Sequence, residues 1–113
     1  MHRFAQHSGG LHVPTIVLAE LYTWAYHKPN PAPLILKIEN DLLPDVTLLD
    51  FDRDCAKEFG RVRGELLQKG LSVSRVDLMI ASVALFHNLT LVTHNTADYH
   101  HVPGLRLDDW LIP

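Results

Sequence analysis

Four oxygen-bearing side chains carry the most informative chemistry in this sequence: Glu20, Asp77, Asn95 and Asp98. Carboxylates that lie a few ångströms apart repel one another, so a group of them requires a nearby positive charge. Mg²⁺ and Mn²⁺ prefer oxygen ligands from carboxylates, amides and water. A cation held in this way can activate water and neutralise charge on a phosphodiester. These residues therefore predict metal-dependent chemistry if the fold brings them together.

The elements that position these residues are helices alternating with short apolar strands. Apolar side chains recur at helical spacing in four segments, 16–27, 33–43, 52–69 and 75–87. Short apolar segments typical of strands lie at 11–16, 46–50 and 90–93, and an edge strand is expected at 105–107. This alternation predicts βαβ units and a parallel sheet flanked by helices.

The spacing along the chain places Asp77 near the end of the strand 90–93. The helix 75–87 rises by about 20 Å. A turn at Asn88 then reverses the chain, and the strand returns by roughly 13 Å. The strand therefore ends beside the first turn of the helix. The polar residues at or just after that strand end are Thr93, Asn95 and Asp98.

Glu20 is expected at the same edge of the sheet. It lies near the start of the helix that leaves strand 11–16, and ligands of open α/β sheets bind at the carboxyl ends of the strands. Its neighbours Ala19 and Leu21 belong to an apolar run, which is an unusual place for a solvated glutamate.

Each of these residues also has a structural interpretation. Asp77 follows Ser74 by three residues, as in a helix cap. Asn95 and Asp98 are common turn residues, and Glu20 alone resembles a solvated helix residue. Only the shared edge favours a functional site over these alternatives.

Length, composition and charge exclude several classes of protein. A chain of 113 residues is predicted to form a single domain, residues 1–113. The net charge of −3 argues against a broad cationic surface for duplex binding. The single cysteine excludes a disulfide framework and fits a reducing cytoplasm. Charged residues and prolines interrupt every apolar run, so neither a membrane span nor a secretory signal is expected.

A basic helix face offers a second contact for nucleic acid. Arg61 and Arg63 lie on the helix 52–69 and could steer an RNA backbone, although such a face is usually only solvated.

Five segments together resemble PIN-domain proteins, and most closely the VapC-type toxins of toxin–antitoxin systems. The resemblance runs from about residue 11 onward through AELY (19–22), FGRVRGEL (59–66), VDLMIASVAL (76–85), LTLVTHNTADY (89–99) and VPGLRLDDW (102–110). It implies a three-layer α/β/α sandwich with a short parallel sheet. It also implies a Mg²⁺- or Mn²⁺-dependent endoribonuclease that cleaves single-stranded or looped RNA, forms a homodimer and binds an antitoxin protein.

The resemblance also assigns roles to particular residues. The family's metal ligands fall on Glu20, Asp77 and Asn95, with Asp98 close behind, and a small hydroxyl residue of the family matches Thr93. The carboxylates would hold the cation, and water activated by the cation would attack phosphorus without a covalent intermediate.

One departure from the family concerns the start of the domain. Family members begin with an apolar central strand that ends in an L-D-T-like motif, whose aspartate is a principal metal ligand. Here no acidic residue precedes Glu20, and the chain is truncated relative to the family by this strand. An empty central position would leave backbone groups unpaired, so we expect a partner chain, dimerisation or strand exchange to fill it. The alternative function is a catalytically impaired PIN remnant that acts as a binding or oligomerisation module.

Overall fold

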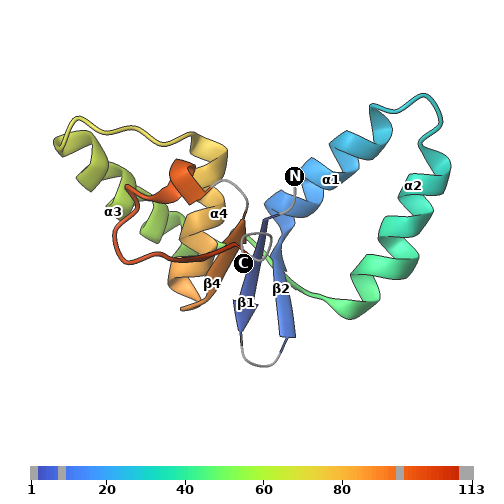
Figure 1. Cartoon of the computed structure of the whole chain (residues 1–113). Helices are drawn as coiled ribbons and strands as arrows, with labels where there is room; N and C mark the ends of the chain where they lie inside the picture. The colour runs from blue at the N-terminus through green and yellow to red at the C-terminus, as the bar shows by residue number, and fades with distance from the viewer. Residues whose placement is uncertain (1–2, 8–9, 94–95, 110–113) are drawn as a thin grey trace.

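A five-stranded sheet with helices on both sides forms the framework of the protein (Figure 1). The computed structural model describes residues 3–7, 10–93 and 96–109. The strands are β1 (Arg3–His7), β2 (Gly10–Pro14), β3 (Thr47–Leu49), β4 (Thr90–Thr93) and β5 (Arg106–Asp108). The main helices are α1 (Thr15–Tyr26), α2 (Ala32–Lys37), α3 (Arg53–Gln68) and α4 (Arg75–Phe86).

Three short helical turns complete the fold. A π-helical turn, η1 (Ile38–Leu42), continues α2, and a 3₁₀ turn, η2 (Leu43–Asp45), leads into β3. A second 3₁₀ turn, η3 (Thr96–Tyr99), follows β4. The helix expected over 33–43 is therefore a short α-helix extended by a π-helical turn.

The sheet order is β3-β2-β1-β4-β5. The pairs β2–β3 and β4–β5 are parallel, as the sequence predicts, whereas β1 pairs antiparallel with both β2 and β4. The sheet is mixed rather than purely parallel, but its other four strands share one direction. The predicted α/β fold class is confirmed.

The central strand β1 corrects the expectation of an empty position in the sheet. Its residues Arg3–His7 belong to the chain itself and hydrogen-bond to strands on both sides. The backbone groups of β2 and β4 that face the centre of the sheet therefore find partners in β1, and no strand from another chain is needed. The sequence RFAQH contains no long apolar run, which explains why periodicity alone did not identify it.

Local signals set the ends of the two helices that pack together. The side chain of Asp52 accepts a 3.0 Å hydrogen bond from the backbone N–H of Cys55 at the start of α3. That hydrogen bond is the main cause of the lowered pKa of Asp52. Gly70, with φ of +70°, follows the end of α3, and Asn88, with φ of 57°, reverses the chain after α4. Helix α1 begins at Thr15 directly after Pro14, and no side chain caps its start.

Buried side chains form two clusters. The larger joins α3 and α4 to β2 and β4, with fully buried residues such as Val62, Ile80 and Leu91. The smaller lies between α1 and α2 and contains Leu21, Ala25 and Ile38. Figure 1 shows the resulting two lobes, α1–α2 on one side of the strands and α3–α4 on the other. Among the described residues, none of the helices is long and apolar enough to cross a bilayer.

Candidate active site

The carboxyl ends of β2 and β4 lie at one edge of the sheet. Both strands are antiparallel to β1, which separates them, so they point the same way. Helix α1 begins at Thr15 directly after β2, and α4 precedes β4 through the tight turn at Asn88. The first turns of α1 and α4 are therefore brought to this edge, and the two helices contact each other. This is the geometry that the spacing of Asp77 and Thr93 predicts.

Glu20 lies in the second turn of α1 and is partly exposed. It lines a groove of about 470 Å³ together with Val76, the residue directly before Asp77. Asp77 itself is not among the residues that line this groove, and it is the contact between α1 and α4 that brings the helices of the two acids together. The residues that line this groove are Ile16, Ala19, Glu20, Thr23, Trp24, His27 and Val76.

Asp77 is buried, with 8% of its surface exposed. Its backbone N–H donates to the hydroxyl of Ser74 at 3.1 Å, so the helix cap predicted from the sequence is present. Its side chain has a different partner, because the hydroxyl of Tyr99 donates to Oδ1 of Asp77 at 3.1 Å. The cap therefore uses the backbone of Asp77, whereas its carboxylate contacts Tyr99 on η3.

The segment after β4 contains the other predicted site residues. Thr93 ends β4 and is 2% exposed. Asp98 is exposed on η3, directly before the buried Tyr99. Asn95 lies outside the described residues, so its predicted role stays a prediction. Through Tyr99, η3 packs against α4, which brings Asp98 to the same end of the sheet as Asp77.

Tyr99 was not among the candidate residues of the sequence analysis. It follows Asp98 in the sequence, and its aromatic ring is a signal for burial rather than for chemistry. Only the structure shows that its hydroxyl reaches the carboxylate of Asp77.

The two arginines predicted to contact nucleic acid differ in their surroundings. Arg61 is exposed and its guanidinium donates to Glu58, which raises the pKa of Arg61. Arg63 lines a cavity of about 270 Å³ between α3 and α4, which Arg75 and Ser72 also line. Arg63 therefore shares a cavity with a second arginine, Arg75, at the start of α4. Arg61 instead forms an ion pair with Glu58.

The donor chemistry of the site fits a hard divalent cation, although the described ligands are few. Among residues 3–7, 10–93 and 96–109, no group of three or more His, Cys, Asp or Glu side chains could hold a metal ion. Magnesium is commonly bound through one or two carboxylates, with water and substrate phosphate completing its shell. Glu20 and Asp77 are the two carboxylates that would bind magnesium in this way.

The central strand β1 reaches this edge of the sheet but places no acidic residue there. The backbone of Arg3 pairs with Thr93, so β1 begins where β4 ends. Neither β1 nor any other residue before Glu20 is acidic. The strand β1, with the sequence RFAQH, therefore supplies no carboxylate ligand at this edge.

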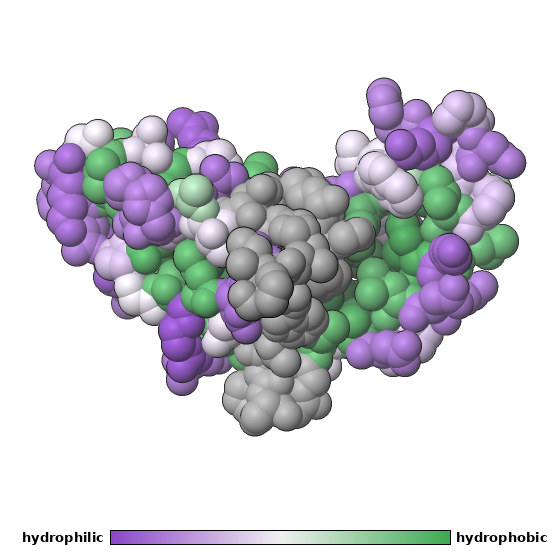
Figure 2. All heavy atoms as spheres, viewed as in Figure 1, coloured by the Kyte–Doolittle hydropathy of each residue, from purple (hydrophilic) through white to green (hydrophobic). Residues whose placement is uncertain are grey.

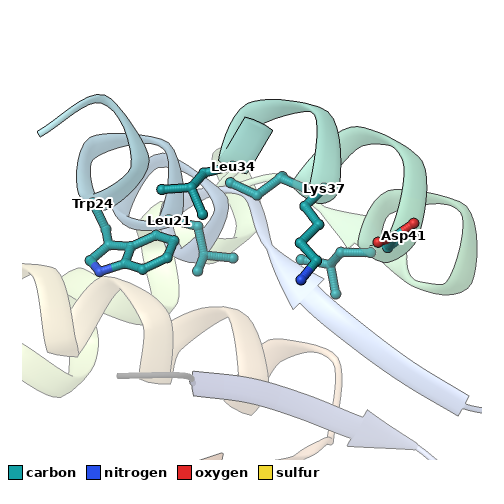
Figure 3. A pocket seen from close by; sticks show the side chains of 7 residues that line it. Leu21, Trp24, Leu34, Lys37 and Asp41 are labelled. Carbon is teal, nitrogen blue, oxygen red and sulfur yellow. The ribbon is translucent and has the colours of Figure 1, made fainter. Parts of the chain in front are cut away.

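A second groove lies between α1 and α2. It has a volume of about 480 Å³, and Figure 3 shows Leu21, Trp24 and Leu34 facing it, with Lys37 and Asp41 on the second helical segment. Figure 2 shows hydrophobic surface gathered over this lobe. Trp24 is 50% exposed and lines both this groove and the one beside Glu20. The apolar surface therefore continues from the α1–α2 lobe to the acidic edge.

Comparison with known proteins gives consistent results. The PIN domain family matches residues 2–105. The chain is 34% identical to Ribonuclease VapC2 of Haemophilus influenzae over 98% of its own length and 83% of that protein. It is 33% identical to the tRNA(fMet)-specific endonuclease VapC of Shigella flexneri, over 96% of this chain and 81% of the relative.

A solved structure shows the same fold. The DNA-bound VapBC complex from Salmonella typhimurium contains a chain that is 32% identical to this one, with a TM-score of 0.82. The likeness covers 88% of this chain and 74% of that chain. The likeness of fold therefore extends over most of the chain.

Proposed function

Because the chain belongs to the PIN-domain family and, within it, to the VapC-type toxins, we propose that it is an endoribonuclease that requires Mg²⁺ or Mn²⁺. The observation that carries this proposal is the contact between α1 and α4, the helices that carry Glu20 and Asp77, at one edge of the sheet. Glu20 lines a groove beside Val76, and Asp77 follows Val76 at the start of α4. The curated relatives quoted above are named as a ribonuclease and an endonuclease, which supports RNA as the substrate.

The proposed cation would neutralise charge on the phosphodiester and activate water for attack at phosphorus. Glu20 and Asp77 would hold it, with Asn95 as a third ligand. Burial of Asp77 and the hydrogen bond from Tyr99 keep its carboxylate in one orientation. Hydrolysis breaks a P–O bond directly, so the proposal needs no protein nucleophile.

Asp98 and Thr93 have supporting roles in this proposal. Asp98 is exposed beside the site and is available to receive a proton from water or to bind through a solvent molecule. Thr93 is buried at the end of β4, where its place favours a role in shaping the site. Arg63 and Arg75 line one cavity near the start of α4 and would contact RNA phosphates.

The test of this proposal is RNA cleavage by the purified chain with and without a divalent cation. A tRNA mixture is the first substrate, because one relative is named for tRNA(fMet). We expect cleavage with Mg²⁺ or Mn²⁺, loss of cleavage with EDTA, and at least about a hundredfold loss in Glu20→Gln and Asp77→Asn. Asp45→Asn, an exposed acid on η2, is the matched control and should cleave like the wild type. Equal cleavage by all four proteins would show that this site assignment is wrong.

A second candidate function is a binding or oligomerisation module without efficient catalysis. The observation that favours it is that residues 3–7, 10–93 and 96–109 include no group of three or more His, Cys, Asp or Glu side chains that could hold a metal ion. Under this alternative, the wild type would bind Mn²⁺ weakly and leave RNA intact at all cation concentrations. The same cleavage assay therefore separates the two candidates.

We further propose that an antitoxin protein occupies the groove between α1 and α2. The solved relatives include complexes named VapBC, and an apolar groove between helices is suited to the apolar face of an amphipathic helix. Leu34→Glu would put a charge into this groove and should abolish co-purification with a co-expressed antitoxin. Leu67→Glu, an exposed leucine on α3, is the control and should retain the partner.

The same proposal includes a homodimer located in the cytoplasm. A homodimer follows from the family resemblance and is tested by sedimentation of the purified chain. Cytoplasmic location follows from an RNA substrate and from the single cysteine in the sequence.

A further inference from the structure

We propose that Tyr99 is a positioning residue for Asp77, and that its hydroxyl sets the affinity of the site for a divalent cation. This inference rests on the proposed function. It assigns a role to a residue outside the predicted ligand set, and its basis is the 3.1 Å hydrogen bond from Tyr99 to Oδ1 of Asp77.

Both partners of this hydrogen bond are held in place by other contacts. Tyr99 is fully buried in the large core cluster, and its carbonyl accepts a 3.0 Å hydrogen bond from the N–H of Val102. The backbone of Asp77 is held by Ser74 at 3.1 Å. The hydroxyl and the carboxylate therefore meet between two fixed backbones, and the hydrogen bond restricts the rotation of the carboxylate.

A carboxylate has two oxygens, and Tyr99 engages one of them. Donation to Oδ1 restricts the rotation of the carboxylate and so reduces the freedom that cation binding must remove. Hydrogen bonds to metal-ligating carboxylates typically change metal affinity by 10- to 100-fold when they are removed. The same contact connects η3, which contains Asp98, to the first turn of α4.

The direct test is Tyr99→Phe, which keeps the ring in the core and removes the hydroxyl. We expect the dissociation constant for Mn²⁺, measured by calorimetry, to increase about tenfold. RNA cleavage should fall at limiting Mn²⁺ and recover when the Mn²⁺ concentration is raised by about the same factor. The KM for RNA should stay unchanged, because Tyr99 acts through Asp77. A purely structural role would lower the melting temperature but would not produce rescue by Mn²⁺.

The matched control is Tyr22→Phe. The hydroxyl of Tyr22 also donates to a carboxylate, Oε2 of Glu39 at 3.2 Å, but this pair joins α1 to η1. The control should bind Mn²⁺ like the wild type. Equal Mn²⁺ affinity in the wild type and Tyr99→Phe would overturn the role of Tyr99 while leaving the proposed function intact. A wild type that neither binds Mn²⁺ nor cleaves RNA would overturn both.

A second measurement does not depend on the folding of Tyr99→Phe. The sequence has three tyrosines, so the variant with Tyr22→Phe and Tyr26→Phe leaves Tyr99 as the single site for 3-fluorotyrosine. Its ¹⁹F resonance should shift on titration with Mg²⁺, and the shift should vanish when Asp77→Asn is added. A resonance that does not respond to Mg²⁺ while the protein binds the ion would contradict the proposal.

Discussion

Ser74 and Asp77 are joined through the backbone rather than through two side chains. The Ser74 hydroxyl accepts the Asp77 N–H at 3.1 Å, whereas the Asp77 carboxylate accepts from Tyr99. A capping box would turn the side chain of the third residue back to the cap. Here the serine supplies the cap, and the aspartate side chain is directed to the edge of the sheet where β4 ends.

Removal of this cap should weaken the fold measurably. Ser74→Ala is expected to lower the free energy of unfolding by about 1 kcal/mol, because the first turn of α4 loses its hydrogen-bond acceptor. Urea denaturation followed by circular dichroism measures this change. Ser72→Ala, on the loop before the helix, is the control and should stay within about 0.5 kcal/mol of the wild type. Identical unfolding midpoints for both variants would contradict the cap.

The central position of β1 predicts strong sensitivity to proline. Ala5 is paired with His12 on one side and with Leu91 on the other. Ala5→Pro should cost about 3 kcal/mol or more, because proline removes a backbone donor from the middle of a sheet. Thr47→Pro, at the first residue of the edge strand β3, should cost much less. Thermal unfolding of the two variants provides the comparison, and similar melting temperatures would argue against a central β1.

The large core should be far more sensitive to truncation than the sheet edge. Leu91→Ala removes a fully buried side chain from β4 and should lower the free energy of unfolding by about 2–5 kcal/mol. Leu48→Ala, on the edge strand β3, where Leu48 is 41% exposed, should cost less than about 1 kcal/mol. Chemical denaturation distinguishes the two effects. A larger loss at Leu48 would mean that β3 is covered in solution.

The buried thiol of Cys55 predicts an alkaline limit to stability. Burial raises the pKa of Cys55 from 9.0 to about 11. A raised pKa in the folded state favours the neutral thiol, so its contribution is complete below pH 9.0 and is lost as the pH rises through about 11. The free energy of unfolding should therefore fall in this window. Cys55→Ala should show a shallower fall, and parallel curves for the two proteins would contradict this origin.

Local patterns in the sequence determined most of the helices and strands. The apolar periodicity predicted a helix over 75–87 and a strand over 90–93, and the structure places α4 and β4 within one residue of these limits. Asp52 and Gly70 mark the two ends of α3 because capping and positive φ are properties of single residues. The shared edge for Glu20 and Asp77 followed from the same spacing, since parallel strands align the helices that follow and precede them.

Tertiary structure decided the features that depend on partners distant in the sequence. The segment Arg3–His7 has a weak local pattern, and its place in the centre of the sheet depends on the edges that β2 and β4 offer. The hydrogen bond between Tyr99 and Asp77 spans 22 residues and forms because η3 packs on α4. The sequence by itself determined which residues could bind a cation, whereas packing decided how those carboxylates are held.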